Sequence, residues 1–323
     1  MSTACFGPTR SPMSFAGRDL TGGCAAVIVH WRDARDTERC VRSLRADAPG
    51  MTVVVVDNGS DDGSGAAVGR ALADLTDVEV LRVAQNRGFG AGCNLGFECV
   101  LRDARRFERV LLVNPDAIVE AGAVAALVDV AERHPDAGIV GGNVLSIDGE
   151  RILFESGRFR PRTLGRCQVR APAGAREHEV SFVTGALMLI DAGLLRAGLR
   201  FDERYFLYVE DLDLCCQVRA RGRSLWVTRA ARIRHRDGGS QAGEPPVLGS
   251  MRARQLEHLA RGKVILARKW LTRPQRLSFY ALAFVLRPLG GLWLARGVGF
   301  LAPYFRGLFA GLRVPLPGDR PRR

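Results

Sequence analysis

The feature that most constrains the fold is an alternation, between Cys24 and Gly142, of short apolar runs with segments of helical periodicity. The apolar runs are rich in β-branched residues and too short for buried helices, so they predict strands buried on both faces. Strands that alternate with single helices predict an α/β fold with a mostly parallel sheet and flanking helices. The predicted strands are 24–31, 52–57, 78–83 and 109–114, the predicted helices are 35–48, 63–75, 91–103 and 120–133, and an apolar run follows at 138–142.

The rhythm changes after residue 143, where irregular, arginine-rich sequence interrupts the alternation. From about residue 249 the chain is predicted to be helical, and Pro274, Pro288 and Pro303 each fit the first turn of a separate helix. The other predictions are a hairpin within 151–170, a strand that begins the run 179–190, a helix at 209–221, and short strands at 225–228 and 231–235.

The charge of the chain is concentrated at one end. The net charge is +13, yet residues 1–248 contain 32 basic and 32 acidic residues, whereas residues 249–323 contain 15 basic and 2 acidic residues. A neutral body with a cationic end predicts contact with an anionic surface, either phospholipid or nucleic acid. Nucleic acid is the weaker alternative, because this end is rich in Phe, Leu and Gly and carries no recognition motif.

The apolar part of the basic end is expected to lie on a membrane rather than to cross it. Its uncharged runs, 277–286, 288–295 and 297–305, are shorter than the roughly 18 residues that a span needs. Apolar residues that alternate with spaced arginines are typical of helices at the surface of an anionic leaflet. The alternative is that these helices pack on the domain and their arginines face water. The apolar residues concerned are Phe279, Phe284, Leu292, Trp293, Phe300, Phe305 and Phe309.

The eight cysteines predict reduced thiols in a cytosolic protein, because no CxxC pair and no Cys/His cluster with zinc spacing occurs. Cys215 and Cys216 are expected to pack within a buried helix. Residues 1–23 are rich in Ser, Thr, Pro and Gly and lack an apolar core, which predicts a flexible leader and no signal peptide.

Polar residues follow two of the predicted strands, at the sheet edge where open α/β folds bind ligands. The strand at 52–57 ends in DNGSDD, so the Asp57 carboxylate is a candidate for contacting a base or ribose. The strand at 109–114 ends in NPDA, where Asp116 is a candidate ligand for Mg²⁺ or Mn²⁺. In both cases a turn or a helix cap is the alternative.

The glycine-rich loop QNRGFGAGCNLGF at 85–97 does not fit a dinucleotide-binding site. A GxGxxG motif needs its third glycine where Cys93 or Leu95 stands, and the loop follows the third predicted strand rather than the first. This disfavours a dinucleotide-dependent oxidoreductase. The glycines either bring backbone close to a phosphate or sugar, or allow close packing of the next helix on the sheet.

The densest acidic cluster lies in FDERYFLYVEDLDLCCQVRARG at 201–222. Glu210, Asp211 and Asp213 fall at the start of a predicted helix, where acids favour the helix dipole. Three acids beside aromatic residues exceed what capping requires, and a carboxylate next to apolar groups is suited to act as a general base. His235 lies at a predicted strand end before a Gly-Gly loop, either as a ligand or as a packed side chain.

Seven segments, in this order and at these intervals, resemble the family 2 glycosyltransferases and, within them, the bacterial rhamnosyltransferase-like branch. The resemblance covers about residues 24–240 and implies a GT-A fold. It also implies inverting transfer of a sugar from a nucleotide sugar, with dTDP-rhamnose as the leading donor, to a saccharide or lipid-linked acceptor in cell-envelope polysaccharide synthesis. A membrane- or nucleic-acid-binding protein that keeps only the fold is the alternative. The segments are AVIVHW with CVRSL, VVVDNGSDDGS, QNRGFGAGCNLGF, LLVNPDA, VTGALMLI, FDERYFLYVEDLDLCCQVRARG and HRDGGS.

The resemblance implies roles for particular residues. Asp211 would be the catalytic base, with Asp213 or Glu210 as second choices. Asp116, in the NPD that stands for the family's DxD, would hold Mg²⁺ or Mn²⁺ on the donor diphosphate, and His235 would complete the metal site. The residues expected to bind the nucleotide sugar are His30, Asp57, Asn58, Arg87, Gly88, Asn94, Asn114, Asp116, Gly185 and Ala186.

The expected organisation has four parts. A protein so built is expected in the cytoplasm, peripheral at the inner face of the plasma membrane, with no nucleic-acid partner. The parts are a flexible leader at 1–23, a GT-A domain at 24–245 with a nucleotide-sugar half (24–142) and an acceptor half (143–245), a basic amphipathic helical region at 246–313, and a flexible tail at 314–323.

Overall fold

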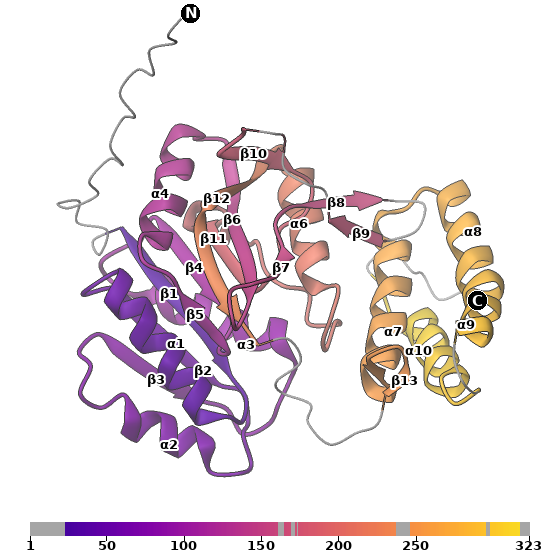
Figure 1. Ribbon diagram of the computed structural model, residues 1–323, viewed down its shortest axis with the longest axis horizontal. Helices are drawn as coiled ribbons and strands as arrows, with labels where there is room; N and C mark the ends of the chain where they lie inside the picture. Colours follow the sequence, from indigo (N-terminus) through magenta and orange to yellow (C-terminus); the bar gives the residue numbers. More distant parts are fainter. Residues whose placement is uncertain are drawn as a thin grey trace, which may run out of the picture.

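A computed structural model describes residues 23–160, 165–168, 172, 174–236, 246–294 and 298–316. In this part of the chain ten strands form one sheet, eight of them in the order β10-β12-β6-β11-β4-β1-β2-β3, with β5 on β12 and β7 on β6. Helices cover both faces of the sheet, and a separate group of helices lies beyond one side of it (Figure 1). The predicted α/β fold with flanking helices is confirmed.

The central strands are buried along their whole length. β1 and β2 pair in parallel, and every residue of both is buried because helices cover the two faces. This is why they occur in the sequence as unbroken apolar runs. β3, at the edge, is only half-buried. The strands are β1 (Cys24–His30), β2 (Thr52–Asp57), β3 (Val78–Arg82), β4 (Arg109–Val113), β5 (Ala117–Val119), β6 (Ala137–Ser146), β7 (Ile152–Phe154), β10 (Glu177–Val180), β11 (Leu187–Asp191) and β12 (Ser224–His235).

Helix α3 packs closely on the sheet because its inner face carries glycines. A Cβ atom at Gly92 would lie 2.7 Å from Val29 Cγ1, and one at Gly96 would lie 2.3 Å from Val27 Cγ1. The close-packing interpretation of the glycine-rich loop is therefore confirmed. The helices of this domain are α1 (Ala34–Asp47), α2 (Ser64–Ala71), α3 (Phe89–Arg102), α4 (Ala123–Arg133), α5 (Ala192–Arg196) and α6 (Glu210–Ala220).

The strand order reverses beside β1. β2 and β3 extend from one side of β1, whereas β4 pairs with its other side. In an open α/β sheet, such a reversal leaves a crevice at the carboxyl ends of the strands, where ligands bind. His30 ends β1, Asp57 ends β2 and Asn114 follows β4, so residues predicted to bind the nucleotide sugar gather at this edge.

Two predictions for the second half of the sheet are corrected. The apolar run 179–190 contains two strands with different partners, since β10 pairs with β12, whereas β11 pairs antiparallel with β4 and β6. The two short strands predicted between 225 and 235 are one strand, β12, whose register against β6 shifts between Thr228 and Arg232. Local periodicity does not reveal either feature, because the pairing partners lie far away in the sequence.

Several smaller predictions can also be compared with the structure. The hairpin predicted within 151–170 is confirmed, since β8 (Gly157–Arg160) pairs antiparallel with β9 (Gly165–Gln168). Cys215 is buried in α6 as expected, whereas Cys216 is only half-buried. Residues 1–22 of the leader, 237–240 of HRDGGS and 317–323 of the tail lie outside the described residues.

α7 connects the C-terminal helices to the sheet domain, because it contacts α6 and also packs on α10. Glycines bring α10 close, since a Cβ atom at Gly307 would lie 2.2 Å from Glu257 O. Within the described chain, no helix is both long and apolar enough to span a membrane. The elements are β13 (Pro246–Leu248), β14 (Met251–Arg252), α7 (Ala253–Trp270), α8 (Arg273–Ala281), the π-helical turn η2 (Leu282–Leu286), α9 (Arg287–Leu294) and α10 (Leu301–Arg313).

Two predictions for this region are corrected. α8, η2 and α9 follow one another without a break, so Pro288 lies inside a continuous helical run instead of starting a new helix. The missing N–H of this proline is accommodated directly after the π-helical turn. Phe279 and Phe300, expected on the membrane face, are buried against the neighbouring helices at 0% and 1% exposure.

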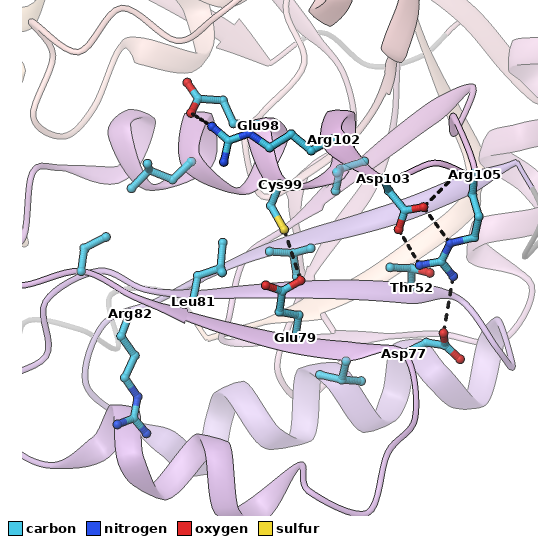
Figure 2. A pocket seen from close by; sticks show the side chains of 15 residues that line it. Thr52, Asp77, Glu79, Leu81, Arg82, Glu98, Cys99, Arg102, Asp103 and Arg105 are labelled. Carbon is cyan, nitrogen blue, oxygen red and sulfur yellow. Dashed lines mark hydrogen bonds and ion pairs between the residues drawn. The ribbon is translucent and has the colours of Figure 1, made fainter.

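A hollow of about 660 Å³ lies between β3 and α3 at the edge of the sheet (Figure 2). Its charged groups pair with one another, since Arg105 binds both Asp77 and Asp103, and Cys99 Sγ lies 3.3 Å from Glu79 Oε2. The hollow arises because α3 packs on β1 and β2 and leaves the inner face of the edge strand uncovered. It lies apart from the β1/β4 crevice, so we place the functional site elsewhere.

Candidate functional site

A cavity of about 460 Å³ lies at the carboxyl ends of β4 and β12. Polar groups reach it from four segments of the chain that are far apart in sequence. Three phenylalanine side chains, Phe89, Phe154 and Phe182, contribute apolar walls. The polar residues that line it include Asn114, Thr184, Glu210, Asp211 and His235, together with the backbone of Gly185 and Ala186.

His235 joins the end of β12 to the segment that follows β4. β5 pairs antiparallel with β12, with Ala117 opposite His235. This pairing brings His235 Nε2 to 3.0 Å from Asp116 Oδ1 and to 3.0 Å from Asn114 Nδ2. One imidazole nitrogen cannot donate to the carboxylate and accept from the amide at the same time. A carboxylate oxygen and an imidazole nitrogen that converge in this way have the chemistry of metal ligands.

These residues fit a divalent cation as a site with two protein ligands. No group of three or more His, Cys, Asp or Glu residues that could hold a metal ion occurs among the described residues. Mg²⁺ often binds through one or two carboxylates and completes its shell with substrate phosphates and water. Asp116 and His235 would therefore hold the ion together with a diphosphate, and we expect ion and diphosphate to bind cooperatively.

Asp211 is the second residue of α6 and lines the same cavity. Its Oδ2 accepts a hydrogen bond from Gly185 N at 3.3 Å, and its Oδ1 accepts one from Leu212 N at 2.8 Å. The side chain is buried, and Gly185 packs directly against it, since a Cβ atom there would lie 3.5 Å from Asp211 Cβ. Ala186 O in turn accepts a hydrogen bond from Asn114 N at 3.1 Å. The 185–186 backbone thus links the Asp211 carboxylate to the segment that carries Asp116.

Asp213 is held away from the cavity by four side chains. Tyr205 Oη and Trp270 Nε1 donate to its Oδ1 at 3.2 and 2.7 Å. Gln217 Nε2 and Lys269 Nζ donate to its Oδ2 at 2.9 and 2.8 Å. The residue is completely buried, and both oxygens are engaged. A substrate hydroxyl would have to displace this network to reach it, so Asp213 is the least suitable base of the three acids.

The turn before α6 is strained and is braced from outside the sheet domain. Tyr208 and Val209 have φ values of 68° and 73°, in the left-handed region that a β-branched residue rarely adopts. Gly262 of α7 packs against this turn, and a Cβ atom there would lie 3.1 Å from Tyr208 O. The C-terminal helices therefore support the segment that presents Asp211. No turn residue marks positions 208–209 in the sequence, so sequence patterns could not have located this feature.

Asp57 ends β2 and is almost completely buried. Ser60 N donates to its Oδ1 at 3.1 Å. Its Oδ2 lies so close to Gly65, at the start of α2, that a Cβ atom there would lie 1.6 Å away. The carboxylate is thus fixed between the DNGSDD turn and the first turn of α2.

His30, the partner of Asp57 on β1, is completely buried. Its Nδ1 lies 2.8 Å from Thr37 Oγ1, and its Nε2 lies 3.1 Å from Ser64 Oγ. Burial lowers the pKa of His30, although Asp57 and other nearby acids oppose the shift. Because both nitrogens are engaged with hydroxyl groups of α1 and α2, we expect His30 to hold the first turns of these helices at the end of β1 and not to touch a ligand.

Asn58, Gly88 and Asn94 tie the glycine-rich loop to its neighbours. Asn58 Nδ2 donates to Gly88 O at 3.0 Å. Gly88 lies against Phe206, where a Cβ atom would be 2.4 Å from the carbonyl oxygen. Asn94 bonds the backbone of Phe201 through both ends of its amide, at 2.9 Å each. These residues therefore hold the 201–206 segment against the glycine-rich loop and α3.

Arg87 is the exposed member of this loop. Its side chain is 58% exposed and pairs with Glu203 at 2.7 Å. An exposed ion pair of this kind is weak and exchanges readily with other anions. Arg87 is therefore the loop residue best able to reach a phosphate.

Replacing Gly88 with alanine is expected to lower the free energy of unfolding by about 2–3 kcal/mol, because a φ of +96° is strained for alanine and the new Cβ atom would clash with Phe206 O. The measurement is urea unfolding. The matched control is Gly122→Ala, where φ is +79° but no atom lies within 4 Å, and the expected loss is about 1 kcal/mol. Equal losses in the two variants would show that the contact with Phe206 does not matter.

Comparison with known proteins agrees with this arrangement. The family described as glycosyltransferase-like family 2 matches residues 22–255, which include every segment that reaches the cavity. The chain belongs to glycosyltransferase family 2. Its catalytic class is accordingly that of a glycosyltransferase.

The relatives of this glycosyltransferase include proteins from two strains of Mycobacterium tuberculosis, CDC 1551 / Oshkosh and H37Rv. Both are named N-acetylglucosaminyl-diphospho-decaprenol L-rhamnosyltransferase. Each is 27% identical over 253 residues, which cover 70% of this chain and 80% of the relative.

Among solved structures, the glycosyltransferase resembles the crystal structure of GalNAc-T7 with UDP, GalNAc and Mn²⁺, with a TM-score of 0.64 and 15% identity. The match covers 87% of this chain but only 53% of GalNAc-T7, so this chain corresponds to about half of that protein. At this identity the likeness establishes the fold, which is that of GT-A glycosyltransferases.

Some residues around the site of this glycosyltransferase had no signal in the sequence. Phe154 and Phe182 line the cavity, but the sequence around each of them carries no motif that indicates a binding site. Lys269 and Gly262 lie in the basic end of the chain, and only the packing of α7 brings them near the acidic cluster. Their positions near the site follow only from the tertiary packing of segments that are distant in the sequence.

Proposed function

We propose that this glycosyltransferase transfers L-rhamnose from dTDP-rhamnose, with inversion, to a hydroxyl of a saccharide carried on a polyprenyl diphosphate. The observation that carries the proposal is the placement of Asp211 in the same cavity as Asn114 and His235. The site thus has one carboxylate for the acceptor and, beside His235, a second carboxylate for the donor diphosphate. The names of the mycobacterial relatives support the choice of sugar and of acceptor class.

In the proposed reaction, Asp211 takes the proton from the acceptor hydroxyl while that oxygen forms a bond to the anomeric carbon. The bond from this carbon to the donor diphosphate breaks, and the electron pair leaves with the nucleoside diphosphate. The hydrogen bonds from Gly185 N and Leu212 N fix the orientation of the Asp211 carboxylate before the acceptor binds, so the base is preorganised. Glu210 is the second choice for the base, because it also lines the cavity.

The donor half of the proposed site lies at the carboxyl ends of β2 and β4. Asp57 would contact the base or ribose, and Arg87 would approach the diphosphate. Asp116 and His235 would hold Mg²⁺ or Mn²⁺, and the ion would neutralise charge on the leaving diphosphate. The likeness to a glycosyltransferase structure that contains Mn²⁺ and UDP supports a metal-dependent donor site.

The proposed place of action is the cytoplasmic face of the plasma membrane. A polyprenyl diphosphate acceptor is anchored in the bilayer, whereas a nucleotide sugar is water-soluble. An enzyme that joins them must meet both phases at the surface. The proposed boundaries of the GT-A domain, 24–245, place the whole cavity within that domain.

The proposal is tested by thermal unfolding with UDP, dTDP or GDP, each with and without Mn²⁺. A ligand that binds only the folded state stabilises it by about 2.7 kcal/mol at a hundredfold excess over its dissociation constant. We expect dTDP to give the largest shift, and to do so only with Mn²⁺. In His235→Ala the Mn²⁺-dependent part of the shift should disappear. If dTDP stabilised the protein equally without Mn²⁺, the proposed metal site would be contradicted. If no nucleotide changed the unfolding temperature, the proposed donor would be contradicted.

A further inference from the structure

The outer surface of the C-terminal helices is apolar and exposed. Trp293 is 87% exposed and Leu277 is 72% exposed, values that are unusual for such side chains in water. On α8, η2 and α9 these residues recur at helical spacing, which places them along one side. The set, which we name the outer apolar face, consists of Leu277, Val285, Leu286, Leu289, Leu292 and Trp293.

The opposite side of the same helices is already covered. Phe279 and Ala283 are completely buried, and Phe284 packs on Phe305 and Phe309 of α10, with ring centroids 6.4 and 5.8 Å apart. Tyr304 Oη donates to Ala283 O at 2.8 Å. The helical run is therefore apolar around most of its circumference, and a helix of that kind normally has its second side covered as well.

The charge around the outer apolar face selects an anionic partner. Residues 271–316, which include the helices of this face, contain six arginines and no Asp or Glu. On α8, Arg273 is exposed and Arg276 is half-exposed. A second copy of the chain would bring two such cationic surfaces together, which is unfavourable. A partner surface with both apolar groups and negative charge would match the exposed apolar side chains of the face and the arginines around it.

We propose that the outer apolar face docks into the interface of an anionic phospholipid bilayer. Trp293 and Leu289 would enter the boundary between head groups and acyl chains, and the surrounding arginines would contact lipid phosphates. The helices would lie along the surface, in keeping with the finding that no described helix is suited to span a membrane.

The docked face is joined to the candidate active site by two helices. The π-helical turn η2, between α8 and α9, packs on α10 through Phe284. α10 in turn packs on α7 (Figure 1). Gly262 of α7 contacts the strained turn that presents Asp211. Docking would thus hold the acceptor half near a lipid-anchored substrate. This link to the acceptor rests on the proposed function, whereas docking itself stands on the exposed residues.

The test is sedimentation of the full chain with vesicles of phosphatidylglycerol mixed with phosphatidylcholine, compared with vesicles of phosphatidylcholine alone. We expect binding to the anionic vesicles only. The double variant Trp293→Ser/Leu289→Ser should bind the anionic vesicles more weakly by at least about tenfold, because two large apolar groups lose their burial. The matched control is Ile152→Ser, which removes a 53% exposed apolar side chain outside the face and should bind as the parent chain does.

Three results would overturn the inference. The first is equal binding to both kinds of vesicle, and the second is binding that Trp293→Ser/Leu289→Ser leaves unchanged. The third is a dimer, or a complex with duplex DNA, that is lost in the double variant, since the face would then serve another partner. The vesicles contain no acceptor, and thermal shifts with dTDP are recorded on the same samples. Failure to dock is therefore distinguishable from failure of the proposed donor site.

Discussion

Asp211→Asn is expected to lower the rate of sugar transfer by roughly 10²–10⁴-fold, which is the usual contribution of a positioned general base. The asparagine amide cannot accept the acceptor proton, but it keeps the size of the carboxylate and the contact with Leu212 N. Asp57, Asp116 and His235 are left intact, so the affinity for dTDP should change little. The measurements are the turnover number with a lipid-linked acceptor and the dissociation constant of dTDP.

The matched variants for this prediction are Glu210→Gln and Asp213→Asn. Glu210 lines the same cavity, and its replacement should reduce turnover less than that of Asp211. Asp213 lies outside the cavity in a buried network, so its replacement should act mainly on stability. Full activity in Asp211→Asn would contradict the assignment. A loss as large in Glu210→Gln, with normal activity in Asp211→Asn, would move the role to Glu210.

Lys269→Met is expected to lower the free energy of unfolding by about 3–5 kcal/mol, the usual cost of removing one partner from a buried ion pair. Lys269 Nζ lies 2.6 Å from Asp202 Oδ2 and 2.7 Å from Asp213 Oδ1. These two acids have side chains that are 9% and 0% exposed, so water cannot replace the lost ammonium. The measurement is urea unfolding at neutral pH. The matched control is Arg306→Gln, which breaks an exposed pair with Glu257 and should cost about 0–1 kcal/mol.

The pH dependence of the same variant gives a second readout. Burial would raise the pKa of Asp202, but hydrogen bonds from Arg204 and Lys269 outweigh this and lower the pKa to about 2. An unperturbed aspartate titrates near pH 4. The stabilisation linked to Asp202 is therefore complete above about pH 4 and is lost as the pH falls to about 2. Lys269→Met should weaken this acid dependence, and an unchanged pH profile would contradict the role of Lys269.

The predictions for Asp211 and Lys269 assign different roles to two acids of one sequence motif, Asp211 and Asp213. Asp211 and Asp213 are two residues apart in EDLD, both near the start of α6. Sequence patterns identify the cluster but give no basis for separating its members. In the structure, one carboxylate lines a cavity, whereas the other binds four side chains, two of them from α7. The difference comes from tertiary packing, since α7 begins about forty residues later in the chain.

The parallel part of the sheet could be predicted because each of its strands is buried on both faces. Such strands must be apolar along their length, and a chain that folds this way shows the pattern locally. The same reasoning places Asp57 and Asn114 at one edge, because they follow strands that run in the same direction. The separate strand β11, the antiparallel pairing of β10 and β11, and the continuity of β12 were not predicted, because the partner strands lie far away in the sequence.

The sequence by itself determined the α/β class, the family, the cluster of acids and the cationic end of the chain. These properties depend on the order and the spacing of residues, which are local. Only the tertiary structure decided that Asp213 is a buried anchor and that Trp293 rather than Phe279 is exposed. Hydrogen bonding and burial depend on which distant segments come into contact, and hydrophobic periodicity alone does not specify those contacts.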